Sequence, residues 1–316
     1  MIEDPDWPRA SAWLAGSGAQ ATEGGSASGS RDGAPAGAPT LAVLGAPVSR
    51  ASISPSSAHT TPAAIRAALR RFSTWCAPVA VDLAGVRVTD LGDLAVADLE
   101  LQRANDVIAA AVGAVEADLL VVLGGDNSVT RPALRGRVPV LAEAGLLTLD
   151  AHHDVRGFHA GPTNGTPVRG LIADGLPGGN VVQVGIGAFT NSPAHARWCA
   201  EQGITVVGLD AAVSEGVAAC VTRHLDALTA RCTGIWVDLD VDVLDAAFAP
   251  GCPGARPGGM TPAQLHAAAF AAGAHPAVVG IDVVEVDAAA DPTGTTVDNA
   301  ALCLLHAAAG LAVRVR

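Results

Sequence analysis

Short apolar runs that end in Gly or Asp alternate along this chain with longer Ala-rich stretches, whose apolar residues recur at helical spacing. Continuously apolar strands that alternate with helices are typical of a parallel sheet covered by helices on both faces. The sequence therefore predicts an α/β fold, a three-layer α/β/α sandwich with a mainly parallel sheet of about eight strands. The expected strands cover residues 41–45, 86–90, 119–125, 146–150, 181–185, 204–210, 235–240 and 278–283, and the expected helices cover residues 62–72, 99–116, 193–202, 213–230, 262–272 and 294–310.

The first forty residues differ in composition from the rest. Residues 16–39 are almost entirely Gly, Ala, Ser, Pro and Thr, with a few charges and no large apolar side chain. Such a segment cannot bury enough surface to offset the entropy lost on ordering. We expect residues 1–40 to form a flexible tail, with Trp7 and Trp13 as a short anchor ahead of its Gly-rich part, and residues 41–316 to form one catalytic domain.

Charge and composition exclude several classes of partner. The 316 residues carry 19 basic and 31 acidic side chains, a net charge of −12. Nucleic acids and anionic membranes bind basic patches, so we expect neither as a partner. The six cysteines include no CxxC pair, and no apolar run reaches the roughly 20 residues of a membrane span. No secretory signal is recognised, so we expect a cytoplasmic protein.

Polar side chains gather at the carboxyl ends of three expected strands, where ligands bind in parallel sheets. In an extended chain residues i, i+2 and i+4 point to one side, so acids and imidazoles at alternate positions converge on one face. A lone Asp at a strand end is usually a turn or cap residue. Two alternating runs directly after apolar strands instead favour a metal site. The three groups are Asp126 and Asn127; Asp150, His152 and Asp154; and Asp238, Asp240 and Asp242.

Carboxylates that face one another at a strand end repel strongly unless cations lie between them. Two divalent ions would relieve the repulsion. Ligation that is rich in oxygen and poor in imidazole favours Mn²⁺ over Zn²⁺. The sequence thus predicts a dinuclear site that holds two Mn²⁺ ions per subunit.

The same residues resemble the signatures of a known family. Residues 124–128 read GGDNS, residues 150–154 read DAHHD, and residues 238–245 read DLDVDVLD. The pattern is similar to that of the arginase/agmatinase/formimidoylglutamase superfamily, the ureohydrolases, whose signatures are GGDH, DAHxD and a DxDxxDP run. The resemblance extends from about Leu41 to Gly310. It implies a dimanganese hydrolase with an arginase-like three-layer fold that assembles as a homo-oligomer.

The resemblance also implies a role for each ligand. Asp150 and Asp238 look like the ligands that bridge the two ions, and Asp154 looks like a ligand of one ion. His152 and Asp240 look like ligands of the other ion.

Two positions depart from the family pattern. The first ligand of the family is usually His, and here it is Asn127, whose amide oxygen is neutral and a weaker ligand than imidazole. One ion is therefore expected to be held loosely. Ala246 stands where the third signature often has Pro.

Two such ions lower the pKa of a water molecule between them, so that hydroxide is present near neutral pH. That hydroxide can add to the carbon of an amidinium or guanidinium group, after which ammonia or an amine leaves. Glu285, within residues 282–287 (DVVEVD), matches the Glu with which the family pairs the cationic head of the substrate. A solvated or purely structural Glu is the alternative.

The loop after the second signature bears on the substrate. Residues 161–169 read GPTNGTPVR and follow Arg156. This run resembles formimidoylglutamase, whereas agmatinases more often carry His where Asn164 stands. Formimidoylglutamate bears two carboxylates, and Arg is the best bidentate partner of a carboxylate. We expect Arg156, Asn164 and Arg169 to bind substrate, and the alternative for Arg169 is a helix cap or an ion pair with Asp174.

These patterns favour a formimidoylglutamase, which converts N-formimidoyl-L-glutamate and water to L-glutamate and formamide in histidine degradation. The alternatives within the family are an agmatinase or a guanidino-acid ureohydrolase, acting on another small amidine or guanidine. A metal-depleted binding homologue is the non-enzyme alternative, because Asn127 replaces the usual His.

Overall fold

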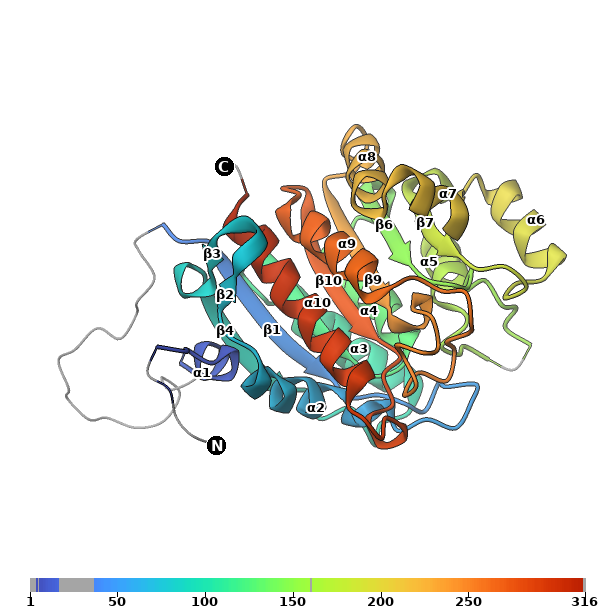
Figure 1. Cartoon of the computed structure of the whole chain (residues 1–316). Helices are drawn as coiled ribbons and strands as arrows, with labels where there is room; N and C mark the ends of the chain where they lie inside the picture. The colour runs from blue at the N-terminus through green and yellow to red at the C-terminus, as the bar shows by residue number, and fades with distance from the viewer. Residues whose placement is uncertain (1–3, 5, 17–36, 160, 315–316) are drawn as a thin grey trace.

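An eight-stranded sheet lies at the centre of the computed structural model, which describes residue 4 and residues 6–16, 37–159 and 161–314 (Figure 1). All neighbouring strands in this sheet are parallel, in the order β4-β1-β5-β10-β9-β6-β7-β8. The predicted fold class is confirmed. The strands are β1 (Thr40–Ala46), β4 (Arg87–Asp93), β5 (Leu119–Gly124), β6 (Ala144–Leu149), β7 (Val181–Ile186), β8 (Thr205–Gly208), β9 (Gly234–Asp240) and β10 (Val278–Val284).

Two hydrophobic cores lie on opposite faces of the sheet because successive strand residues point to opposite sides. In β5, for example, Leu119 and Val121 enter one core, whereas Leu120 and Val122 enter the other. The first core is covered by α1 (Ala10–Ala15), α2 (Thr61–Ala68), α7 (Leu209–Glu215), α8 (Val217–Thr229), α9 (Pro262–Ala274) and α10 (Thr295–Ala312). The second is covered by α3 (Leu101–Gly113), α4 (Thr130–Arg137), α5 (Pro167–Asp174) and α6 (Pro193–Gln202).

The helices follow the sequence pattern with three differences. The stretch predicted as one helix over residues 213–230 is part of two, because Gly216 adopts a φ of 89° between α7 and α8. The eight-residue helices α4 and α5 were not predicted, since each is too short to show a clear helical period. A small antiparallel hairpin, β2 (Trp75–Cys76) with β3 (Val81–Asp82), was also not predicted.

Part of the segment expected to be a flexible tail is packed against the domain. The backbone N–H of Ala10 donates to the Phe72 carbonyl at 3.0 Å, and the indole Nε1 of Trp13 donates to the Val86 carbonyl at 3.2 Å. Leu14 is buried in the same core as α2. Residues 17–36, the Gly-rich part of the expected tail, lie outside the described residues.

The strand order brings the polar strand ends together. After β5 the chain crosses to β6 and leaves two positions between them, which β10 and β9 later fill. The carboxyl ends of β5, β10, β9 and β6 are therefore neighbours, and such a point of reversal is where ligands bind in open parallel sheets. Among the described residues, no helix has the length and apolar character needed to cross a membrane.

Candidate active site

At the ends of three strands, β5, β6 and β9, an Asp at the last position or within two residues of it folds the following loop back onto itself. The carboxylate of Asp126 accepts from the backbone N–H of Ser128 at 3.1 Å. Asp150 and Asp240 each accept in the same way from the N–H two residues ahead, at 2.5 and 2.8 Å. Asp favours such turns because its short side chain reaches the backbone two residues on. These turns hold the side chains that follow the strands above the edge of the sheet.

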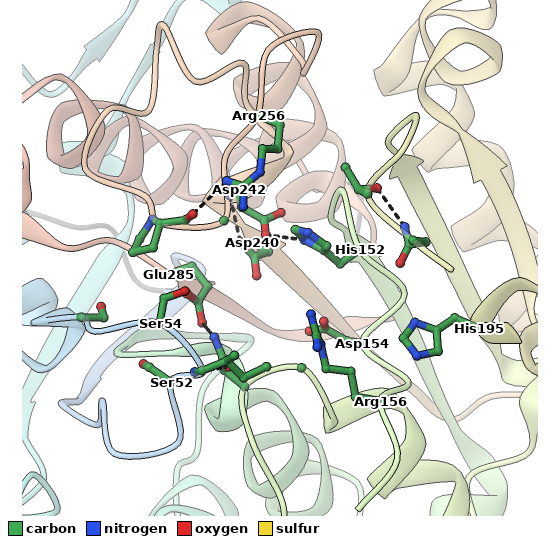
Figure 2. Close-up of a pocket in the computed structure, with 18 of the residues that line it drawn as sticks. Ser52, Ser54, His152, Asp154, Arg156, His195, Asp240, Asp242, Arg256 and Glu285 are labelled. Carbon is green, nitrogen blue, oxygen red and sulfur yellow. Dashed lines mark hydrogen bonds and ion pairs between the residues drawn. The ribbon is translucent and has the colours of Figure 1, made fainter. Parts of the chain in front are cut away.

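Two groups of metal-ligating side chains share Asp150. Ligand atoms of Asp150, His152 and Asp242 lie within 4.8 Å of one another, and so do ligand atoms of Asp150, Asp154 and Asp240. The imidazole Nδ1 of His152 lies 2.7 Å from Asp242 Oδ2. Figure 2 shows His152, Asp154, Asp240 and Asp242 directed toward one another from two different strands. The structure therefore brings the two Asp-rich runs of the sequence into one cluster.

Asn127 lies against the second of these groups. Its Nδ2 donates to Asp154 Oδ2 at 2.7 Å and to Asp240 Oδ2 at 3.2 Å, while its Oδ1 accepts from Thr130 Oγ1 at 2.6 Å. The side chain thus occupies the place where the family pattern has a ligand. Half a turn of the amide would direct Oδ1 to the carboxylates, the orientation that coordination of a cation requires.

The structure differs from the sequence interpretation at Asp238, which belongs to neither group. It lies within β9, in register with Asp282 of β10, and both side chains are buried below the cluster. The indole Nε1 of Trp236 donates to Asp282 Oδ2 at 3.0 Å. Asp242, which the sequence interpretation left out of the ligand set, takes part in its place, because β9 ends at Asp240 and the chain then turns.

The cluster carries more negative charge than its burial tolerates. Burial, together with the charge of Asp242, raises the pKa of Asp150 to about 7. Burial also raises the pKa of Asp154 and of Asp240 well above the usual range. Burial alone would lower the pKa of His152, but its contacts with Asp150 and Asp242 prevail and raise that pKa to about 11. A site that pulls protons onto its own carboxylates and imidazole is suited to divalent cations, which relieve the same repulsion. The clusters fit a metal site.

Glu285 follows β10 and is held beside the cluster. Its Oε1 accepts from the backbone N–H of Asn127 at 2.7 Å and from Asn164 Nδ2 at 2.9 Å. Burial, followed by the charge of Asp126, raises the pKa of Glu285 to about 8. Glu285 has a φ of 66° and Asp154 a φ of 51°, left-handed conformations that are strained for residues other than Gly. Strain of this kind, held at two carboxylates of one pocket, indicates a functional site.

A cavity of about 310 Å³ opens above the cluster. Arg156, Asn164 and Glu285 line it, as the sequence analysis expects of substrate-binding and catalytic residues. Segments that follow five strands, β1, β6, β7, β9 and β10, contribute to its wall. The wall includes several serines after β1 and the imidazole of His195 on α6 (Figure 2).

Arg169 is not part of the cavity wall. Its Nε donates to the Val155 carbonyl at 2.7 Å, and its guanidinium stacks over the Trp198 ring at 4.1 Å. Asp174, the alternative partner, pairs with Arg131 at 2.7 Å instead. Arg169 therefore supports the loop that carries Asp154 and Arg156 from below, and the structure gives it no contact with the cavity.

The sequence analysis gave no role in the site to two residues, Asp242 and Arg256. Asp242 could have been found from the third signature, because aligning Ala246 with the Pro of that signature makes Asp240 and Asp242 its first two acids. Arg256 lines the cavity from the loop between β9 and α9. No sequence motif identifies Arg256, because its position at the pocket depends on the path of that loop.

Comparison with known proteins agrees with the geometry. The sequence profile of the arginase family matches residues 39–310. The chain belongs to the arginase family. It is 34% identical to the formimidoylglutamase of Halalkalibacterium halodurans over 86% of this chain and 87% of that protein. It is 37% identical to the guanidinopropionase of Pseudomonas aeruginosa, over 67% of each chain.

The solved structure of formimidoylglutamase from Bacillus subtilis superimposes on this chain with a TM-score of 0.87 and 30% identity. The match covers 100% of this chain and 95% of that one. The resemblance inferred from the three signatures is thereby confirmed, and the protein is an arginase-family hydrolase.

Proposed function

We propose that this hydrolase converts N-formimidoyl-L-glutamate and water to L-glutamate and formamide. The observation that carries the proposal is the pocket itself, in which Glu285 and Arg156 line one cavity above two groups of metal ligands that share Asp150. The similarity to formimidoylglutamases over most of the chain supports the same substrate.

Two Mn²⁺ ions are proposed to occupy the two groups. His152 and Asp242 would hold one ion, Asp154 and Asp240 the other, and Asp150 both. Bound there, the ions supply a nucleophile at neutral pH by lowering the pKa of water. Asp242 replaces Asp238 in the ligand set expected from the sequence, and Asn127 would complete the second group as a weak neutral ligand.

Glu285 is proposed to bind the cationic amidinium of the substrate. The backbone N–H of Asn127 and the side chain of Asn164 hold its carboxylate in place, so the side chain is already oriented when the substrate binds. The cation of the substrate favours the ionised form of Glu285 against the burial that raises its pKa to about 8. The resulting anion keeps the amidinium protonated and its carbon electrophilic. The water oxygen then bonds to that carbon, the bond from carbon to the glutamate nitrogen breaks, and a proton from the water goes to that nitrogen, which leaves as the amine of L-glutamate. The carbon, with the water oxygen and its remaining nitrogen, leaves as formamide.

A guanidino acid is the second candidate substrate, and the similarity to guanidinopropionase favours it. Such a substrate carries one carboxylate, for which Arg156 alone would suffice. Agmatine carries a second cation in place of a carboxylate, and Arg156 in the cavity wall would repel it.

One preparation of the purified protein, loaded with Mn²⁺, tests the proposal. Release of glutamate and formamide from N-formimidoyl-L-glutamate is expected, with much lower release of urea from 3-guanidinopropionate, arginine and agmatine. Metal analysis of the same sample is expected to give two Mn²⁺ ions per chain. Urea without glutamate would transfer the assignment to a guanidino substrate, and a protein that binds no Mn²⁺ would be a binding homologue.

We propose further that the enzyme works in the cytoplasm as a homo-oligomer, with residues 41–316 as its catalytic domain and residues 1–40 ahead of it. Light scattering coupled to size-exclusion chromatography measures the mass in solution. A single peak at the monomer mass would contradict the assembly.

A further inference from the structure

Two arginines in the cavity wall, Arg156 and Arg256, pair with no carboxylate among the described residues. They come from different loops, Arg156 from the segment after β6 and Arg256 from the segment after β9. Figure 2 shows Arg256 on the side of Asp242 and Arg156 on the side of Asp154. The carboxylate cluster thus lies between two cations that have no partner within the described protein.

The guanidinium of Arg256 is fixed in place while most of its donors stay free. Its Nη1 donates to the Pro253 carbonyl at 3.0 Å and to the Ala255 carbonyl at 2.8 Å. Neither Nε nor Nη2 has a partner among the described residues. These two nitrogens form the edge of a guanidinium that binds a carboxylate with two parallel hydrogen bonds. Because the carbonyls already orient the group, little entropy would be lost when a carboxylate binds.

Arg156 is held in place by the loop of residues 161–169. Its backbone N–H donates to the Gly165 carbonyl at 2.9 Å, and its side chain passes over the same residue. A Cβ at Gly165 would lie 2.7 Å from Arg156 Cδ and 3.0 Å from Nε, so only Gly leaves room for the side chain to take this path. The guanidinium makes no hydrogen bond to the described residues, and all five of its donors remain free for a ligand.

The charges of Arg156 and Arg256 are not needed to balance the carboxylates of the pocket. The two metal groups contain four carboxylates, which two divalent ions would neutralise. Glu285 would be neutralised by the amidinium of the substrate. His195 adds no cation near neutral pH, because burial and the charge of Arg156 lower its pKa. The metal ligands and Glu285 are thus matched in charge without Arg156 and Arg256, which leaves two cations in the cavity wall for anionic groups of a substrate.

We propose that Arg156 and Arg256 each bind one carboxylate of the substrate, so that the pocket selects amidines with two carboxylates over those with one. This inference rests on the proposed function and adds Arg256 as a residue that determines specificity. With one arginine for each carboxylate of the substrate, the cavity wall does not need Arg169 as well, although Arg169 belongs to the same sequence motif as Asn164.

The test compares Arg156→Gln and Arg256→Gln on three substrates. These are N-formimidoyl-L-glutamate, N-formimidoyl-4-aminobutyrate, which lacks the carboxylate next to the reacting nitrogen, and N-formimidoyl-L-norvaline, which lacks the distal one. Each variant is expected to lower kcat/KM for the diacid by about tenfold to a hundredfold, the effect of one charged hydrogen-bonded pair. For the monoacid that lacks the matching carboxylate, kcat/KM should stay close to the wild-type value.

Arg197→Gln, at an exposed arginine of α6 outside the cavity wall, is the matched control and should change neither value. If the arginines only maintain the fold, all three substrates lose activity in parallel and the inference is overturned. It is also overturned if the preference for the diacid survives in both variants.

Calorimetric binding of L-glutamate and of 4-aminobutyrate to the Mn²⁺-loaded protein separates this inference from the proposed function. Tighter binding of L-glutamate that depends on both arginines would support the inference even if N-formimidoyl-L-glutamate were not hydrolysed. Hydrolysis of that substrate by the wild type, with equal binding of the two amino acids, would retain the function and refute the role of the arginines.

Discussion

In two regions of the molecule that bury ionisable side chains, the loss of water shifts the pKa values in opposite directions, because one region buries acids and the other a histidine. At the carboxyl edge of the sheet, Asp150, Asp154 and Asp240 face one another and their pKa values rise. Between α9 and α10, His266 stacks on His306 with ring centroids 5.0 Å apart and lies 3.3 Å from the Asn299 carbonyl. Burial, followed by the charge of His306, lowers the pKa of His266 to about 4, so that it stays neutral.

The difference distinguishes a site from a core. The helix layer uses a group that can give up its charge at neutral pH and still make a hydrogen bond. The sheet edge gathers several acids that, without a cation, lose their charge by taking up protons, as their raised pKa values indicate. In these two regions, buried titratable groups indicate a functional site where like charges repel one another and no group of the described protein neutralises them.

Asp150→Asn is expected to have the largest effect, because Asp150 belongs to both metal groups. The kcat for the Mn²⁺-dependent reaction should fall by at least about a thousandfold. Mn²⁺ at a hundred times its Kd should stabilise the wild type by about 2.7 kcal/mol, and this gain should vanish in the variant. Thermal unfolding with and without Mn²⁺ measures it. If Mn²⁺ still raised the Tm of the variant, Mn²⁺ binding at the edge of the sheet would not depend on a ligand shared by the two metal groups.

Asp242→Asn and Asp238→Asn form a matched pair at the next level. Both residues are buried acids, Asp238 within β9 and Asp242 just after it, but only Asp242 belongs to a metal group. We expect Asp242→Asn to weaken Mn²⁺ binding by about a hundredfold and Asp238→Asn to leave it unchanged, as measured by equilibrium titration. The opposite result would restore Asp238 as the ligand.

The sequence interpretation took Asp238 as a ligand in place of Asp242, and the alternation of strand residues explains why it could not tell the two apart. Alternation places Asp238, Asp240 and Asp242 on one side of an extended chain, but it does not tell where the strand ends. In the structure the strand ends at Asp240, so that Asp238 remains inside the sheet beside Asp282. The inner strands could be predicted because each is a continuous apolar run, although the edge strands β4 and β8 are not. The short helices and the place of Arg256 depend on tertiary packing.

His266→Gln tests the other region. The pKa of His266 is depressed from about 6.5 in the unfolded chain to about 4, so its contribution to stability is complete above pH 6.5 and is lost as the pH falls toward 4. Between pH 7 and pH 5 the metal-free wild type should lose about 2 kcal/mol more stability than the variant.

Urea unfolding at the two pH values measures this difference. His59→Gln, at an exposed histidine, is the control and should behave as the wild type does. Equal losses in all three proteins would mean that His266 is not held neutral by the fold.

Asn127→His has the smallest expected effect and compares the two metal groups with each other. An imidazole in place of the amide should raise the affinity for the weaker ion by about tenfold, or about 1.4 kcal/mol. Competition with a chelator measures the affinity, with Asn105→His on α3 as the control. No gain would place Asn127 outside the coordination sphere and leave it as a donor to Asp154 and Asp240.

The left-handed backbone at Glu285 has an evolutionary consequence. Gly is the residue best suited to a φ of 66°, so a Glu285→Gly change would relax the local chain at the same time as it removed the carboxylate. Random mutation that is screened for thermal resilience alone would tend to accept this exchange. Directed evolution of a more thermostable variant must therefore select for turnover at every round. Otherwise it will favour a more stable protein that has lost the carboxylate of Glu285 and with it the activity.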